Sequence, residues 1–152
     1  MKLSPLQLKE HRFTAVSVRT IEGGSPSAEP SLVPTIWFAP HSLNEWRLAL
    51  TVKLGSANVA QPFSYEADIQ LQGLVQVTDD SLKERKEQLA LVNGFSILYS
   101  AAREMLLNIT SRAANGAVTL PTLSFVELVT EARKQKAAEK PPESSTPAAL
   151  RA

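Results

Sequence analysis

Two stretches of strict alternation restrict the fold more than any other feature of the chain. Apolar side chains occupy every second position from Trp46 to Leu54 and again from Phe63 to Leu71, with mostly polar residues between them. A repeat of two residues places successive side chains on opposite faces of a β-strand. The turn GSANVAQP joins the two stretches. We therefore expect an antiparallel hairpin with one apolar face, which another element must cover.

Two further strands are expected before this hairpin. Residues 5–20 alternate between apolar and polar side chains but break step at Phe13, which predicts a strand with a bulge or bend. Residues 22–34 collect Gly, Ser and Pro without periodicity, and we expect a loop there. Residues 36–38 then predict a short second strand that ends at Pro40.

Helical signals follow the strands. Ser81 is a candidate N-cap for a short helix that runs to Val92, and Asn93-Gly94 is expected to interrupt it. A long helix should then run to about Ala113. The capping-box pattern of residues 124–127 predicts a final helix.

Strands followed by helices indicate the α+β class. The expected architecture is a four-stranded antiparallel sheet with C-terminal helices packed on one face. Residues 1–133 should form one domain of ordinary size. Residues 134–152 are rich in Ala, Pro and Ser, and this composition predicts a disordered tail.

The long helix has an unusually wide apolar side. At 100° per residue, its apolar side chains in residues 97–112 span about 200°, whereas a helix that covers one core needs a stripe of about 100°. A sheet with a single apolar face would leave part of this arc in water, and such a surface usually marks an interface. We therefore expect a homo-oligomer whose interface uses Leu98, Ala102, Met105, Leu106 and Ile109.

Composition excludes several classes of function. The chain has 16 Lys and Arg against 15 Asp and Glu, and it lacks a basic run with interleaved aromatics, so nucleic acid is not an expected partner. Cysteine is absent, which removes disulfides, thiolate metal sites and a cysteine nucleophile. The sequence shows no signal peptide and no membrane span, and we expect a cytoplasmic protein.

Catalytic and metal-binding patterns are also missing from the sequence. His11 and His41 lack the neighbouring ligands and spacing of a metal site. The chain contains no G-x-S-x-G, P-loop or G-x-G-x-x-G motif, and no base accompanies its serines. We therefore expect no enzymatic activity, no metal and no cofactor.

The C-terminal half resembles a known family. The run NGFSILYSAAREMLLNITSRAANGAVTLPTLSFVELV contains Ala102-Arg103-Glu104, then Ser111-Arg112, then the LPTLSF segment that ends at Phe125. In this order and spacing, and preceded by the strand YEADIQLQGLVQV, these residues resemble the SecB family of protein-export chaperones. The resemblance covers roughly residues 5–130.

The resemblance implies a fold, an assembly and a function. The family folds as a four-stranded antiparallel sheet with helices on one face. Its sheets join edge to edge through the first strand, and its dimers pair into tetramers through the long helices. Its members bind non-native polypeptides without ATP and deliver secretory precursors to the SecA motor. The resemblance therefore implies unfolded polypeptide clients, SecA as a partner, and a tetramer built as a dimer of dimers.

Site residues follow from this expectation. By their place in the alignment, Glu66 and Asp68 correspond to the family's contact with SecA, although ordinary solvated strand charges would look the same. Client binding needs adaptable apolar surface around the loop, the second strand and the final helix, although core packing could use the same side chains. The candidates for client binding are Leu32, Val33, Ile36, Trp37, Phe38, Leu120, Leu123, Phe125, Leu128 and Val129.

Three alternatives remain open at the level of sequence. The tail has Lys134, Lys136, Lys140 and Arg151 against two glutamates, unlike the acidic tail that the resemblance implies. This difference leaves room for a SecB-like chaperone dedicated to one partner, such as an antitoxin. The others are an oligomeric scaffold without client binding and a small-ligand-binding α+β domain.

Overall fold

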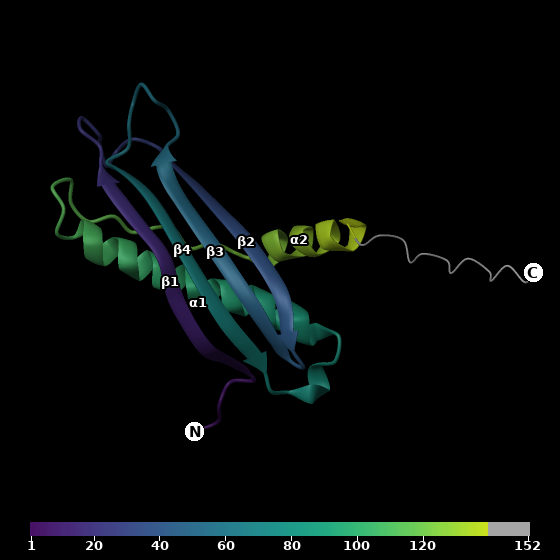
Figure 1. The fold of residues 1–152 in the computed structure, drawn as a ribbon. Coiled ribbons are helices and arrows are strands. Elements are labelled where there is room, and N and C mark those ends of the chain that lie inside the picture. The colour runs from purple at the N-terminus through teal and green to yellow at the C-terminus, as the bar shows by residue number, and fades with distance from the viewer. Residues whose placement is uncertain (140–152) are drawn as a thin grey trace, which may run out of the picture.

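The computed structural model describes residues 1–139 and has the expected α+β architecture. Four antiparallel strands form one sheet with the spatial order β1-β4-β3-β2 (Figure 1). The strands are β1 (Leu6–Thr20), β2 (Pro30–Ser42), β3 (Glu45–Ser56) and β4 (Tyr65–Val77). Strands β1 and β2 are therefore the two edges of the sheet.

The central hairpin of β3 and β4 has one apolar, buried face, as predicted. Leu50 pairs with Leu71 and Val52 with Ile69, and these side chains are all buried on the same face. The register of β1 against β4 shifts between Phe13 and Ala15 and at one position before it, which confirms the expected bulge.

Strand β2 is longer than the short strand we expected, and the loop before it is correspondingly shorter. Its prolines at 30, 34 and 40 lie an even number of residues apart. Residues of the same parity direct their backbone polar groups to the same side of a strand. Because β2 pairs only with β3, its prolines can face the unpaired edge, where a missing N–H costs no hydrogen bond. Prolines therefore do not end this strand.

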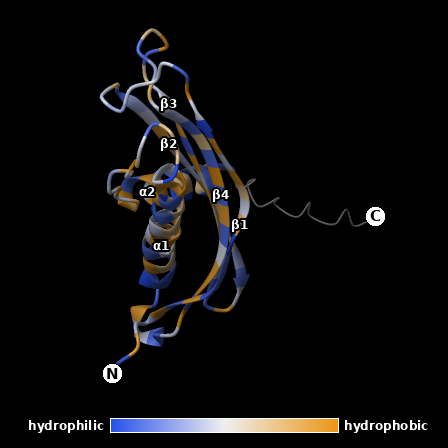
Figure 2. Ribbon diagram, turned by 90° about the vertical axis from the view of Figure 1, so that its left-hand side faces the viewer, coloured by the Kyte–Doolittle hydropathy of each residue, from blue (hydrophilic) through white to orange (hydrophobic). Residues whose placement is uncertain are grey.

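Both helices lie on one face of the sheet (Figure 2). A 3₁₀ turn (Asp80–Leu82) leads into α1 (Arg85–Thr110), and α2 (Val126–Glu139) follows. Helix α1 is continuous, so the interruption expected at Asn93-Gly94 is wrong. Gly94 is instead a point of close packing between α1 and the sheet, since a Cβ there would clash with Leu48 Cδ1 and come within 3.3 Å of Val75 Cγ1.

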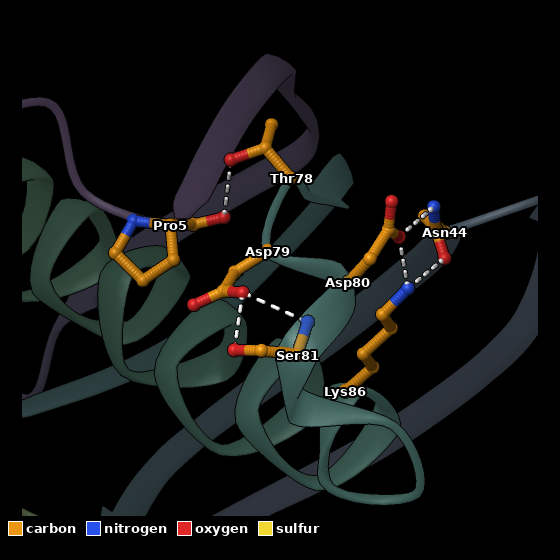
Figure 3. A network of polar contacts seen from close by, with 7 residues as sticks. All are labelled: Pro5, Asn44, Thr78, Asp79, Asp80, Ser81 and Lys86. Carbon is orange, nitrogen blue, oxygen red and sulfur yellow. Dashed lines mark hydrogen bonds and ion pairs between the residues drawn. The ribbon is translucent and has the colours of Figure 1, made fainter.

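The turn between β4 and α1 is fixed by a polar network (Figure 3). The carboxylate of Asp79 accepts hydrogen bonds from Ser81 N at 2.9 Å and Ser81 Oγ at 2.6 Å, so Asp79 caps this turn in place of the expected Ser81. Lys86 Nζ donates to Asp80 Oδ1 at 2.5 Å and to Asn44 Oδ1 at 2.9 Å. The Lys86 ammonium holds the pKa of the Asp80 carboxyl below its usual range. These contacts tie the start of α1 to the β2–β3 turn.

Helix α2 changes the expected domain boundary. It continues through residues 134–139, which we had assigned to a disordered tail. The rest of that expected tail, residues 140–152, lies outside the described residues. Among the described residues, no helix is both long enough and apolar enough to cross a membrane.

Candidate functional site

The chain itself covers much of the wide apolar side of α1. Residues 111–125 run back along the helix as a connecting strap, and α2 follows it. The ring of Phe125 packs on Phe95 with 6.0 Å between centroids and on Tyr99 with 5.6 Å. The strap therefore occupies a position that we had assigned to a second subunit.

Hydrogen bonds hold the strap in place. Tyr99 Oη donates to Pro121 O at 2.7 Å, and Arg103 Nε donates to Leu120 O at 2.9 Å. The buried Thr110 hydroxyl accepts from Val118 N at 2.9 Å. Burial also raises the pKa of the Tyr99 phenol, with Arg103 opposing part of that effect. The strap is thus fixed by side chains that point out of α1.

This arrangement corrects part of the predicted oligomer interface. Leu98, Ala102 and Leu106 have no exposed surface in the single chain, because they pack in its core. They cannot contact a second subunit through their side chains. Met105 and Ile109 remain partly exposed. Met105 follows the exposed Ile97 by eight residues and Ile109 follows Met105 by four, which places the three side chains on the same flank of α1. An apolar flank of α1 therefore persists, but it is narrower than expected.

The predicted client-binding residues are divided in the same way. Four of them are buried in the core and are not available to a client: Phe38, Leu120, Phe125 and Val129. Packing against α1 and the sheet explains this, since Phe125 and Val129 anchor the strap and α2. For these four residues, the prediction of a binding surface is wrong.

The other six candidates retain exposed surface on two faces. Val33 and Trp37 are 51% and 54% exposed on the outer face of the sheet, away from the helices. The remaining four are half-buried, and they pack at the margin of the core: Leu32, Ile36, Leu123 and Leu128. Four of these six residues lie on β2, so the structure places exposed apolar surface on both faces of this edge strand rather than in a single groove.

Helix α2 reaches the outer edge of β2 through one lysine. Lys136 Nζ donates a hydrogen bond to Phe38 O, which shows that this carbonyl faces away from β3. The same ammonium lies 3.8 Å from the centroid of the Phe38 ring and 5.5 Å from that of Trp37. These are cation–π distances. Lys136 thus covers part of an edge that would otherwise be open to a pairing strand.

An open groove of about 820 Å³ lies between this end of β2 and α2. Phe38 and Pro40 form part of its apolar wall, and Arg133, Lys134 and Lys136 project from α2. Glu87 of α1 also lines the groove, and it accepts a hydrogen bond from Arg133 Nε at 2.9 Å.

The sequence reasoning missed Arg133 and Lys136. Residues 134–139 were placed in a tail because of the composition that follows them. The segment EARKQKAAE from Glu131 to Glu139 consists entirely of residues that favour helix. This propensity was the signal that could have extended α2 and placed both cations beside β2.

The outer face of the sheet is electrically balanced around the predicted SecA contact. Glu66 pairs with Arg19 of β1. Asp68 lies opposite Lys53 in the register of β3 and β4. The two carboxylates therefore lie beside two cations and do not form an acidic patch. Within residues 1–139, no group of three or more His, Cys, Asp or Glu side chains is arranged to hold a metal ion.

The sheet order, the helices on one face and the strap along α1 define a SecB-like fold. In solved structures, the same fold occurs in the Mycobacterium tuberculosis SecB-like chaperone Rv1957, determined in complex with a ChAD peptide from the Rv1956 HigA1 antitoxin. The two chains are 19% identical with a TM-score of 0.57, and the match covers 78% of this chain and 91% of that one. No protein-family profile and no curated protein matches the sequence.

A Streptococcus agalactiae protein of unknown function also matches, with 13% identity and a TM-score of 0.42 over 76% of this chain and 96% of that one. Of these two, the M. tuberculosis chaperone has a TM-score above 0.5 and supports the fold.

Proposed function

We propose that this protein is an ATP-independent holdase chaperone that binds non-native polypeptides. The observation that carries the proposal is the exposure of Val33 and Trp37 on the outer face of the edge strand β2, the strand whose Phe38 and Pro40 line the open groove. The SecB-like fold supports it, because a chaperone with this fold has been solved with a peptide bound. Burial of a client's apolar side chains here would contribute roughly 25 cal/mol per Å².

Titration calorimetry with a reduced, alkylated and therefore unfolded client tests this function. We expect binding with micromolar or tighter affinity, together with a change in Trp37 fluorescence. The folded form of the same client is the control and should not bind. A Trp37→Phe variant assigns the fluorescence change, because the second tryptophan, Trp46, is buried. If no unfolded client binds, the protein is better described as an oligomeric scaffold.

We further propose a dedicated polypeptide partner, such as an antitoxin, in preference to general export through SecA. Arg19 and Lys53 neutralise the surroundings of Glu66 and Asp68, which weakens the case for an acidic docking face. A pull-down with purified SecA separates the two roles. Retention of SecA that is lost in the double variant Glu66→Lys/Asp68→Lys would support the export role instead.

The proposed working unit is a homo-oligomer. The partly exposed apolar flank of Ile97, Met105 and Ile109 supports contact between α1 helices. Strand β1 is an edge without proline between Leu6 and Thr20, so it can pair with a second copy. Light scattering at decreasing concentration tests this assembly, and the expected species is a tetramer built as a dimer of dimers.

A further inference from the structure

The groove between β2 and α2 combines an apolar wall with positive charge. Arg133, Lys134 and Lys136 line it, and Glu87 is the carboxylate among its lining residues. The local balance is thus three cations against one anion, whereas the whole chain has a net charge of only +1. This excess suggests a ligand of opposite charge.

The carboxylate of Glu87, which lines the groove, already accepts a hydrogen bond from Arg133. Arg133 donates to Glu87 Oε1 at 2.9 Å and to Gln88 Oε1 at 2.9 Å, so the guanidinium is held against α1. Neutralising Arg133 in this way leaves the charge of Lys134 and Lys136 on the groove side of α2.

Lys136 is positioned for a second acceptor. Its ammonium is held over the Phe38 ring and donates to Phe38 O, while an ammonium has three N–H donors. A carboxylate that reaches it would form a charge-assisted hydrogen bond, which is stronger than a bond between neutral groups. The aromatic ring below excludes water from one side of this contact.

We propose that the groove recognises an acidic side chain of the client, next to an apolar stretch that lies along β2. The class of client is therefore an extended polypeptide in which apolar residues are followed or preceded by Asp or Glu. This inference rests on the proposed holdase function and adds a charge preference to it. Lys134 and Lys136 supply the attraction, and Phe38 supports the ammonium of Lys136.

Three synthetic peptides test the preference on the full chain. They share one apolar segment of alternating sequence and carry two Glu, two Gln or two Lys residues at the same end. We expect the Glu peptide to bind roughly three- to tenfold more tightly than the Gln peptide, the range of partly exposed ion pairs. The Lys peptide should bind more weakly than either. The difference should shrink in roughly 0.5 M sodium chloride, which screens charges beyond a few ångströms.

A matched pair of variants assigns the preference to the groove. Lys134→Gln/Lys136→Gln should bind the Glu and Gln peptides equally, with little change in the affinity for the Gln peptide. Lys2→Gln/Lys83→Gln removes the same charge from exposed positions outside the groove and should keep the preference. Circular dichroism of both variants checks that the fold is retained.

The outcomes separate this inference from the proposed function. If all three peptides bind equally, the charge preference is wrong while the holdase function stands. Tighter binding of the Lys peptide, or a preference that survives in Lys134→Gln/Lys136→Gln, also overturns the inference. If none of the peptides binds and unfolded clients do not bind either, both proposals fail.

Discussion

Gly94 decides how closely α1 approaches the sheet. The missing side chain leaves room for Leu48 and Val75, and both of these are buried and tightly surrounded. An alanine would gain about 1 kcal/mol of helix propensity. It would also overpack the core, which typically costs about 1–3 kcal/mol. Because Leu48 is buried in the core, its methyl group can shift only against other packed side chains, and we expect the second effect to be larger.

We predict that Gly94→Ala lowers the free energy of unfolding by about 1 kcal/mol, measured by urea denaturation. A double-mutant cycle with Leu48→Ala gives the physical cause. Leu48→Ala removes the atom that the new methyl group meets, so the two substitutions together should destabilise by less than the sum of their separate effects. Strict additivity would show that the contact between position 94 and Leu48 is not the source of the cost.

Tyr99 makes stability depend on pH in the alkaline range. Burial raises the pKa of its phenol in the folded protein, so the folded state holds this proton more tightly than the unfolded chain does. The resulting stabilisation is complete below about pH 10, where the unfolded phenol ionises, and it is lost as pH rises through the folded pKa.

We expect the urea midpoint to fall as pH rises above about pH 10, and to fall less in Tyr99→Phe. At neutral pH, Tyr99→Phe should itself cost about 1 kcal/mol, because Pro121 O loses its donor. An equal alkaline loss in both proteins would assign the pH dependence to other groups.

At the scale of elements, the alternation of apolar and polar residues predicted the central hairpin correctly, because each of its strands keeps one buried face and one more exposed face in the fold. The length of β2 was underestimated because we took its prolines as strand breakers. They are tolerated because β2 lies at the edge of the sheet, which the local sequence does not reveal. Gly94 read as a break in α1, although it is a packing contact. Local pattern does not reveal which tertiary neighbour a residue meets.

The wide apolar side of α1 is a second case in which the sequence pattern did not reveal the tertiary neighbour. Periodicity measured its width correctly but could not say that the strap at residues 111–125 covers it in the same chain. We therefore predicted Phe125 and Val129 as client-binding residues, whereas both are buried in the core. Val33 and Trp37 were proposed as part of an apolar group beside a Gly- and Pro-rich segment, and both are exposed in the structure.

The remaining flank of α1 gives a prediction for assembly. Met105→Lys/Ile109→Lys should dissociate the oligomer, because two charges would enter an apolar contact, while the partial exposure of both residues lets the monomer fold. Light scattering and circular dichroism measure the two effects. Glu104→Lys/Asn108→Lys alters exposed neighbours on the same helix and serves as the control. If the Met105→Lys/Ile109→Lys protein keeps its size, this flank is not the interface.

At the scale of the whole molecule, client binding requires exposed apolar surface that the fold tolerates. Among the exposed apolar residues, Val33 and Trp37 lie on β2, whereas Leu43 lies in the turn after β2 and Val59 in the turn after β3. Exposure alone does not make a binding surface, because a peptide needs a continuous path. Of these two pairs, only Val33 and Trp37 share a strand with Phe38, which lines the groove, and with the half-buried residues of β2.

We therefore predict that Val33→Asp/Trp37→Asp weakens binding of an unfolded client by about tenfold or more, since each lost apolar contact is worth about 1 kcal/mol. Calorimetry and suppression of client aggregation measure this effect. Leu43→Asp/Val59→Asp makes the same chemical change at exposed turns and should leave both readouts unchanged. Because all four side chains are exposed, the two variants should melt close to the parent protein. Equal loss of binding in both variants would mean that clients bind nonspecifically to any exposed apolar side chain. The edge of β2 would then have no special role.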